Sequence, residues 1–428
     1  MSHMVGKEAY KSLEERLNKF PQGAPPSETL YKILSLMFTE EEAALVSLLP
    51  FKAFNIKTAS KLWKKKQVET ERILDTLASK ALILDLECEA DGEKKYLTAP
   101  PMAGFFEFAL MRIGGYIDQK ILSELLHQYL DVEDDFVRQL FWGTETKMGR
   151  AFVQERALDN ENSIDILDYE KTSHILKEAK HISVSTCYCR HRAHHLGDDC
   201  YAPMETCISF DNVAYSLVKH NKARKIDASE ALEIVNMAVD HNLVQCGENV
   251  QNKPTFLCNC CKCHCEAFMG ARKFGLLVPM NTTNYIPVIN EDKCVGCGKC
   301  TLVCPMTAIN VDKNNMKTIN NRKFKVAKLT DDLCLGCGVC VKNCPTKAIT
   351  LKRRPQNVVT PTSTIHRVVI SAIEKGQLQN LIFNNNAYKS HKAMAGVIGA
   401  ILKSSPVHKF MASKQMKSVY LANLLAEK

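Results

Sequence analysis

A run of four cysteines occurs twice in the chain, and the second copy begins forty positions after the first. Each copy reads C-x2-C-x2-C-x3-C-P and carries two glycines at matching places. The cysteines are Cys294, Cys297, Cys300 and Cys304 in the first copy and Cys334, Cys337, Cys340 and Cys344 in the second. Clustered cysteines in a reducing compartment bind metal more often than they form disulfides. The repeat therefore predicts two similar metal-binding loops within one small domain.

The rest of the chain places these thiols in a reducing environment. It has 428 residues and 19 cysteines, and no apolar core of a signal peptide follows Lys7 and Lys11. The best apolar stretch, Pro100–Ile117, is interrupted by Glu107 and Arg112, so we expect no membrane-spanning segment. The sequence predicts a soluble, cytoplasmic protein whose cysteines are free to bind metal.

Over residues 284–354 the repeat resembles the bacterial two-cluster ferredoxins, whose ligands follow this spacing. The resemblance implies two 4Fe-4S clusters, with the fourth cysteine of each run binding the other cluster. Cluster 1 would take Cys294, Cys297, Cys300 and Cys344, and cluster 2 would take Cys334, Cys337, Cys340 and Cys304. Strands are expected at 308–311 and 348–351. The insert 312–329 departs from the family pattern, and we expect one more strand at 324–329.

A second cysteine-rich segment precedes the repeat and predicts further metal binding. We assign nine of its ten cysteines to one or two upstream centres: Cys187, Cys189, Cys200, Cys207, Cys258, Cys260, Cys261, Cys263 and Cys265. In an extended chain successive side chains alternate faces, so Cys258 and Cys260 should point one way and the next three cysteines the other. One segment would then supply two additional 4Fe-4S clusters, with one thiol to spare. The alternative is one cubane or a non-cubane centre plus unligated thiols.

Histidines among these cysteines make zinc the minor alternative upstream, because mixed nitrogen and sulfur ligands are typical of zinc. Those histidines are His191, His194, His195 and His264. Nine thiolates overfill a four-ligand zinc site, so iron–sulfur clusters are favoured, and we expect the histidines to be solvated or bonded to backbone. Arg190 is expected to screen cluster charge. Residues 165–354 as a whole resemble multi-cluster iron–sulfur proteins of anaerobes.

Residues 28–100 are expected to fold as helices followed by a hairpin. Thr39 and Glu42 form a capping-box pattern. Helices are expected at 57–66 and 68–80, followed by strands at 82–86 and 94–97 that are joined at Asp91-Gly92. These helices and the hairpin resemble a winged-helix module. The helix that would read DNA presents Glu69, Glu71 and Asp75, so DNA binding is disfavoured and a protein-docking or packing module is favoured. We expect Cys88 to be a buried thiol without a ligand role.

The predicted fold class is α+β with several domains. Their expected order is an N-terminal helix and linker (1–27), a winged-helix-like module (28–100), a helical connector (101–175), a cysteine-rich α/β cluster domain (176–283), a ferredoxin-like domain (284–354) and a basic helical tail (355–428). From residue 353 onward eleven Lys and Arg stand against Glu374 and Glu427, which accounts for the whole net charge of +9. Tail helices are expected at 364–375, 391–404 and 407–426. These helices are expected to pack on the core with a solvated Lys face. The alternative is a basic surface on which a redox partner protein docks.

No glycine-rich motif for flavin or nicotinamide is present in the sequence, so we expect no such cofactor. The leading hypothesis is therefore one-electron transfer, by a carrier or relay subunit of an anaerobic oxidoreductase. One alternative is a redox-sensing transcription regulator that uses the winged helix. Another is an oxidoreductase whose upstream cluster has an open iron position.

Overall fold

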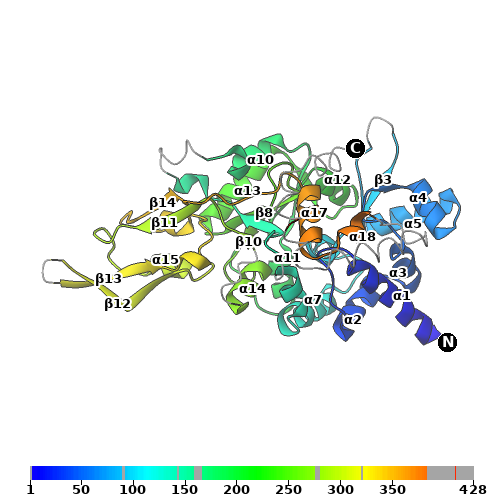
Figure 1. Ribbon diagram of the computed structural model, residues 1–428, viewed down its shortest axis with the longest axis horizontal. Helices are drawn as coiled ribbons and strands as arrows, with labels where there is room; N and C mark the ends of the chain where they lie inside the picture. Colours follow the sequence, from blue (N-terminus) through cyan, green and yellow to red (C-terminus); the bar gives the residue numbers. More distant parts are fainter. Residues whose placement is uncertain are drawn as a thin grey trace.

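The computed structural model describes residues 2–88, 92–141, 144–158, 166–274, 280–319, 322–382 and 410. The molecule is elongated, with N-terminal helices at one end and the hairpin of β12 (Ile309–Ile319) and β13 (Arg322–Leu329) at the other (Figure 1). The largest sheet lies between them. No helix within these ranges is long and apolar enough to cross a bilayer.

The N-terminal part packs five helices against a small antiparallel sheet. The helices are α1 (Ser2–Leu17), α2 (Glu28–Met37), α3 (Glu40–Val46), α4 (Ile56–Trp63) and α5 (Gln67–Ser79); the strands are β1 (Phe54–Asn55), β2 (Ile83–Asp85) and β3 (Lys95–Thr98), in the order β1-β3-β2. Thr39 and Glu42 accept each other's backbone N–H groups, so the predicted capping box is confirmed. Both predicted hairpin strands are present, and Asp91 of their turn lies outside the described residues.

One expectation about this part is wrong. Cys88 is exposed, not buried, because it lies three residues beyond the end of β2, where the chain has left the sheet.

The central sheet has seven strands in the order β10-β4-β8-β9-β6-β5-β7. They are β4 (Gly149–Ala151), β5 (Ile182–Thr186), β6 (Glu205–Phe210), β7 (Arg224–Ile226), β8 (Val244–Glu248), β9 (Phe256–Cys260) and β10 (Met280–Asn281). Only β10 and β4 pair in parallel; all other neighbours are antiparallel. Strand β4 comes from the segment expected to be a helical connector, so that segment helps to build the sheet.

The two faces of this sheet have different neighbours. Val184, Ile208 and Leu257 share an apolar core with residues of α10 (Thr172–Glu178) and α13 (Ala228–Asp240). The opposite face carries cysteines and joins the N-terminal core. The other helices of this part of the chain are α6 (Phe106–Phe108), α7 (Gln119–His127), α8 (Asp135–Phe141), α11 (Tyr188–His195), α12 (Asp211–Lys219) and α14 (Glu266–Phe274), with short helical turns η1 (Pro101–Phe105), η2 (Gln128–Val132), η3 (Glu155–Ala157) and η4 (Asp168–Glu170).

The repeat folds into two similar halves. Strand β11 (Tyr285–Ile289), before the first run, pairs with β14 (Ile349–Arg353), after the second, while β12 pairs with β13 in between. The short helices α15 (Lys299–Val303) and α16 (Val339–Lys342) contain the third cysteine of each run, and η5 (Asp331–Leu333) precedes the second run. The predicted strand of the insert is present, but β12 is longer than expected because it pairs along most of β13.

The first tail helix, α17 (Thr364–Glu374), is confirmed, and α18 (Leu378–Ile382) follows it. Two basic residues of the tail contact other parts of the chain. Arg367 pairs with Glu248 at 3.0 Å, and Lys375 donates to the carbonyl oxygens of Pro21 and Gln139. The first part of the tail therefore contacts both the sheet and the N-terminal part. The helices expected at 391–404 and 407–426 lie outside the described residues, apart from Phe410.

Candidate metal centres

The thiols of the expected cluster 2 surround one cavity. Cys304, Cys334, Cys337 and Cys340 line it together with glycines and apolar side chains, and all four thiols are buried. The fourth cysteine of the first run has thus joined three from the second. The Sγ of Cys304 accepts the N–H of Ala308 at 3.2 Å. Such a donor stabilises negative charge on sulfur, and it is oriented by the backbone alone.

The thiols of the expected cluster 1 are more accessible. Cys300 is buried, Cys294 and Cys344 are partly buried, and Cys297 is exposed. Cys344 accepts the N–H of Ala348 at 3.2 Å, which repeats the Cys304 arrangement in the other half. Three of the four thiols, Cys294, Cys300 and Cys344, pack in one apolar group. The more exposed of the two ferredoxin sites is therefore the one nearest the β12–β13 hairpin.

The insert contributes to this first site directly. The N–H of Ala327 on β13 points to the Sγ of Cys294 at 3.5 Å. Gly296 has a φ of 61°, and an added Cβ there would collide with the carbonyl oxygen of Lys325. Strand β13 therefore lies against the first cysteine loop and requires glycine in it.

In the second half, the neighbouring strand is β11. A Cβ on Gly336 would collide with the carbonyl oxygen of Tyr285, and its φ of 72° also favours glycine. Each cysteine loop is thus covered by one strand: β13 in the first half and β11 in the second.

Burial of these thiols makes them weak acids until a cation is bound. Burial raises the pKa of Cys334 to about 11 and that of Cys337 to about 12, and neighbouring thiolates add to both shifts. Iron must therefore displace protons, so cluster assembly at this site releases protons to solvent.

Upstream, the fold divides ten cysteines into groups of seven and three. We call the larger set the seven-thiol group; it comprises Cys187, Cys189, Cys207, Cys246, Cys258, Cys260 and Cys265. Successive members interact through their side chains, in pairs 187–189, 189–265, 265–260, 260–246, 260–258 and 258–207. The three remaining cysteines, Cys200, Cys261 and Cys263, lie together with His264.

Strand pairing explains most of the seven-thiol group. Cys246 on β8 lies directly opposite Cys258 on β9, and Cys207 on β6 is next to Ile208, which pairs with Leu257. These thiols therefore share one face of the sheet. Cys187 is the N-cap of α11, and Cys189 lies in its first turn.

Two details differ from the sequence prediction. Cys265 joins Cys260 instead of Cys263, because β9 ends at Cys260 and the chain then turns, so that strand alternation no longer applies. Cys246 was left outside the predicted set, yet it is 1% exposed and interacts with Cys260. Cys246 belongs with these thiols because β8 pairs with β9. That strand pairing is long-range, so the local pattern around Cys246 does not indicate it.

The four histidines near these cysteines also have different surroundings. His191 lies 2.7 Å from the backbone oxygen of Leu110, and His194 lies 2.6 Å from Asp199, so neither needs a metal. His195 packs its ring against His191. His264 was expected to behave in the same way and instead lies among three thiols.

Buried charges surround the seven-thiol group. Arg190 has no exposed surface, donates to the carbonyl oxygen of Asn259 at 3.0 Å, and is held cationic by Cys187 and Cys261. It lies between the two thiol groups and can offset negative charge in both. Glu107 is partly buried, and burial of its carboxyl raises its pKa to about 7. Its charge also raises the pKa of Cys207 and Cys258.

Comparisons with known proteins agree with the ferredoxin half of this description. Residues 293–348 match a family described as a 4Fe-4S dicluster domain. No curated protein matches the chain. The chain thus contains a ferredoxin-type 4Fe-4S domain, and its many further cysteines support an iron–sulfur protein.

Proposed function

We propose that this chain is an electron-transfer protein in which the ferredoxin domain carries electrons between a partner protein and an upstream iron–sulfur centre. One observation carries the proposal. Cys304, Cys334 and Cys337 of the second ferredoxin site share a single apolar core with Cys246 and Cys265 of the seven-thiol group. The charge of Cys337 also reaches Cys246. Two sites joined by apolar packing without an intervening domain are suited to electron transfer.

The residues would hold the clusters as the ferredoxin pattern implies. Cluster 1 would use Cys294, Cys297, Cys300 and Cys344, and cluster 2 Cys304, Cys334, Cys337 and Cys340. When bound, each cluster would supply one-electron redox chemistry. The protein contributes N–H donors to sulfur, burial that lowers the local dielectric constant, and the cation of Arg190. The exposed position of Cys297, compared with the buried Cys246, supports electron entry at cluster 1.

The seven-thiol group would hold at least one further cluster. Seven thiols supply one four-cysteine cubane but not two, so a second cluster here would need a shared or non-cysteine ligand. The ligand set proposed upstream is drawn from Cys187, Cys189, Cys207, Cys246, Cys258, Cys260 and Cys265.

The test is anaerobic purification followed by iron counting and electron paramagnetic resonance of the reduced protein. We expect about twelve irons per chain or more, against about eight for the ferredoxin domain alone. Spin coupling between neighbouring clusters should broaden the spectrum. Cys340→Ala should remove about four irons and this coupling, whereas Cys88→Ala, at an exposed thiol, should change neither. A wild-type count near eight would refute the upstream cluster and leave the ferredoxin assignment standing.

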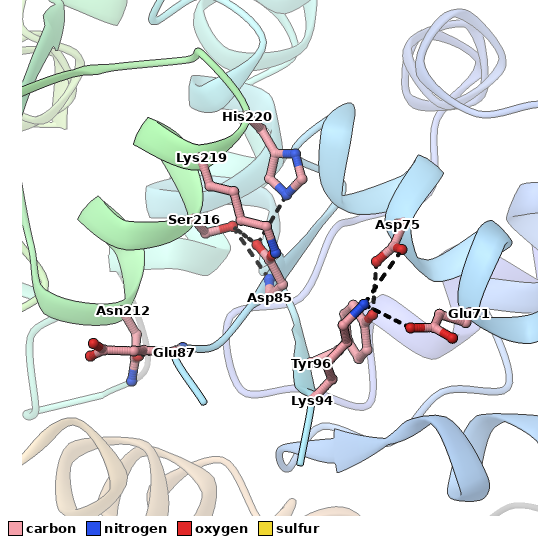
Figure 2. Close-up of polar contacts among 10 residues, drawn as sticks. All are labelled: Glu71, Asp75, Asp85, Glu87, Lys94, Tyr96, Asn212, Ser216, Lys219 and His220. Atoms are coloured by element: carbon pink, nitrogen blue, oxygen red, sulfur yellow. Dashed lines mark hydrogen bonds and ion pairs between the residues drawn. The ribbon is translucent and has the colours of Figure 1, made fainter. Parts of the chain in front are cut away.

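We infer that the N-terminal module, whose helix and strand order is that of a winged helix, serves docking more than DNA binding. Its helix α5 is already engaged by its own sheet (Figure 2): Lys94 pairs with Glu71 at 2.7 Å, and the hydroxyl of Tyr96 donates to Asp75 at 2.9 Å. These acidic side chains remain partly exposed on the helix that would face phosphates. A negative face there opposes nucleic-acid binding.

A second candidate, catalysis at the upstream centre, is favoured by Glu107. A carboxyl that is half ionised near pH 7 beside Cys207 and Cys258 is suited to donate a proton as electrons arrive. Reductase activity with a reduced viologen would then survive Cys294→Ala and be lost in Cys258→Ala. Equal loss in both variants would contradict an upstream active site.

A further inference from the structure

We propose that Cys200, Cys261, Cys263 and His264 form a mononuclear zinc site, separate from the iron–sulfur centres. The thiol sulfurs of the three cysteines and one ring nitrogen of His264 all lie within 4.8 Å of one another. Among the residues that the structure describes, no other group of cysteine, histidine and carboxylate side chains is gathered so closely. This inference does not depend on the proposed electron-transfer function.

Spacing between the ligand atoms separates one metal ion from a cluster. Zinc binds thiolate sulfur at about 2.3 Å in a tetrahedron, so neighbouring sulfurs lie about 3.8 Å apart. Cys200 Sγ and Cys263 Sγ are 3.4 Å apart. In a cubane each thiolate binds a different iron, which holds the sulfurs farther apart. Cys304, Cys334, Cys337 and Cys340 line one cavity and are not gathered within 4.8 Å of one another in this way. The compact group therefore fits a single ion.

The histidine is prepared to be a ligand. His264 is 9% exposed, and its Nε2 lies 3.0 Å from Asp198 Oδ2. Its other ring nitrogen, Nδ1, is buried and has no hydrogen-bond partner among the described residues. A carboxylate on one nitrogen fixes the ring and leaves the other nitrogen free for metal, as is usual for zinc-bound histidine. The unsatisfied Nδ1 is the observation, independent of the thiols, that points to an ion here.

Charge and chain geometry agree with this assignment. Three thiolates, a neutral imidazole and Zn²⁺ carry one negative charge, and the buried cation of Arg190 is close to Cys200 and Cys261. The N–H of His264 donates to Cys261 Sγ at 3.3 Å. Cys200 and Asp198 share one loop, while the other ligands follow β9, so zinc would tie that loop to the segment ending in Cys265. The ion would be structural, because all four ligand positions are filled by protein.

The experiment uses full-length protein produced with both metals present and purified without oxygen. Mass spectrometry should find about one zinc per chain beside the iron, and absorption spectroscopy at the zinc edge should show three sulfurs at about 2.3 Å and one nitrogen at about 2.0 Å. Cys263→Ser, at an exposed position, should lose the zinc and keep the iron. Cys88→Ser should keep both. Absence of zinc from the wild type, or loss of about four irons from Cys263→Ser, would overturn the proposal.

A second variant covers the case in which Cys263→Ser does not fold. Asp198→Asn leaves all four ligands in place and changes a side chain that is 79% exposed. Competition with a chelator should show zinc binding weakened about 10- to 100-fold, with iron unchanged. Unchanged zinc affinity in this variant would contradict ligation by His264.

Discussion

At the scale of single residues, the glycines of the cysteine loops decide how closely a strand can cover a cluster. Gly296 and Gly298 lie in the same loop and both have positive φ, 61° and 75°. A Cβ at Gly296 would meet the backbone of Lys325, whereas a Cβ at Gly298 would meet nothing within 4 Å. Substitution of either glycine would therefore strain the backbone, but only substitution of Gly296 would also cause a collision with β13.

We predict that Gly296→Ala destabilises the ferredoxin domain by about 2–4 kcal/mol, because β13 must move as well as the loop. Gly298→Ala should cost only the backbone strain, about 1–2 kcal/mol. Iron content and the unfolding midpoint measure both effects. If the two variants lose iron equally, contact with β13 is not what the first glycine provides.

Glu107 is a second residue whose environment has a measurable effect, in this case on how stability depends on pH. Its pKa of about 7 in the folded chain lies above the value of about 4.3 expected in the unfolded chain. The folded state therefore binds the extra proton between those values, and the stability contributed by this group falls as pH rises from about 5 to 7.

Glu107→Gln should remove this pH dependence and keep an acceptor for the N–H of Ala103. Relative to wild type, the variant should gain about 2 kcal/mol between pH 5 and pH 8. The measurement is the difference between the two unfolding midpoints at each pH. A difference that stays constant over this range would show that the carboxyl is not titrating there.

At the scale of elements, the β12–β13 hairpin combines position with charge. The hairpin projects at one end of the molecule (Figure 1). The N–H of Ala327 on β13 points to the Sγ of Cys294, which would bind cluster 1. Residues 312–329 hold six Lys and Arg against one acidic residue, Asp312. Lys325 and Lys328 on β13 are exposed. Such a surface attracts acidic partners before contact is made.

We predict that the double variant Lys325→Glu/Lys328→Glu slows electron transfer from a small acidic ferredoxin about tenfold at low ionic strength, with little effect at high salt. Stopped-flow reduction measures the rate. The control is Lys57→Glu/Lys61→Glu on α4, which has the same charge change at exposed positions near the other end of the molecule. Equal slowing by the control would assign the effect to net charge and not to this hairpin.

At the scale of the whole molecule, a buried polar contact helps to join the N-terminal module to the cluster domain. Asp85 on β2 is 4% exposed and accepts from Ser216 at 2.6 Å, from Lys219, and from His220 at 3.1 Å, all at the end of α12 (Figure 2). Burial opposes its ionisation, but these donors outweigh burial and lower its pKa well below the usual range. The contact therefore stays intact above about pH 4 and is lost only in strong acid.

We predict that Asp85→Asn costs about 2–4 kcal/mol at pH 7, because it removes the charge that Lys219 and His220 face. Thermal unfolding measures the loss, and unchanged iron content would show that the clusters remain. Glu87→Gln is the control on the same segment: its ion pair with Lys180 is partly exposed and should contribute under about 1 kcal/mol. A small effect of Asp85→Asn would mean that the module is held by apolar packing alone.

The local pattern of the chain was sufficient to predict the ferredoxin-type domain, which the family match supports, the capping box of Thr39 and Glu42, and a second cysteine-rich region. Ligand spacing and capping act over a few residues, so they can be read directly. Only the tertiary structure decided which upstream thiols meet. Cys246 joins the seven-thiol group through the pairing of β8 with β9, and Cys265 joins it through a turn after β9. His264 lies instead with Cys200, Cys261 and Cys263 and contacts Asp198 on a distant loop. These contacts depend on long-range strand register and loop packing, which the periodicity of a single segment does not encode.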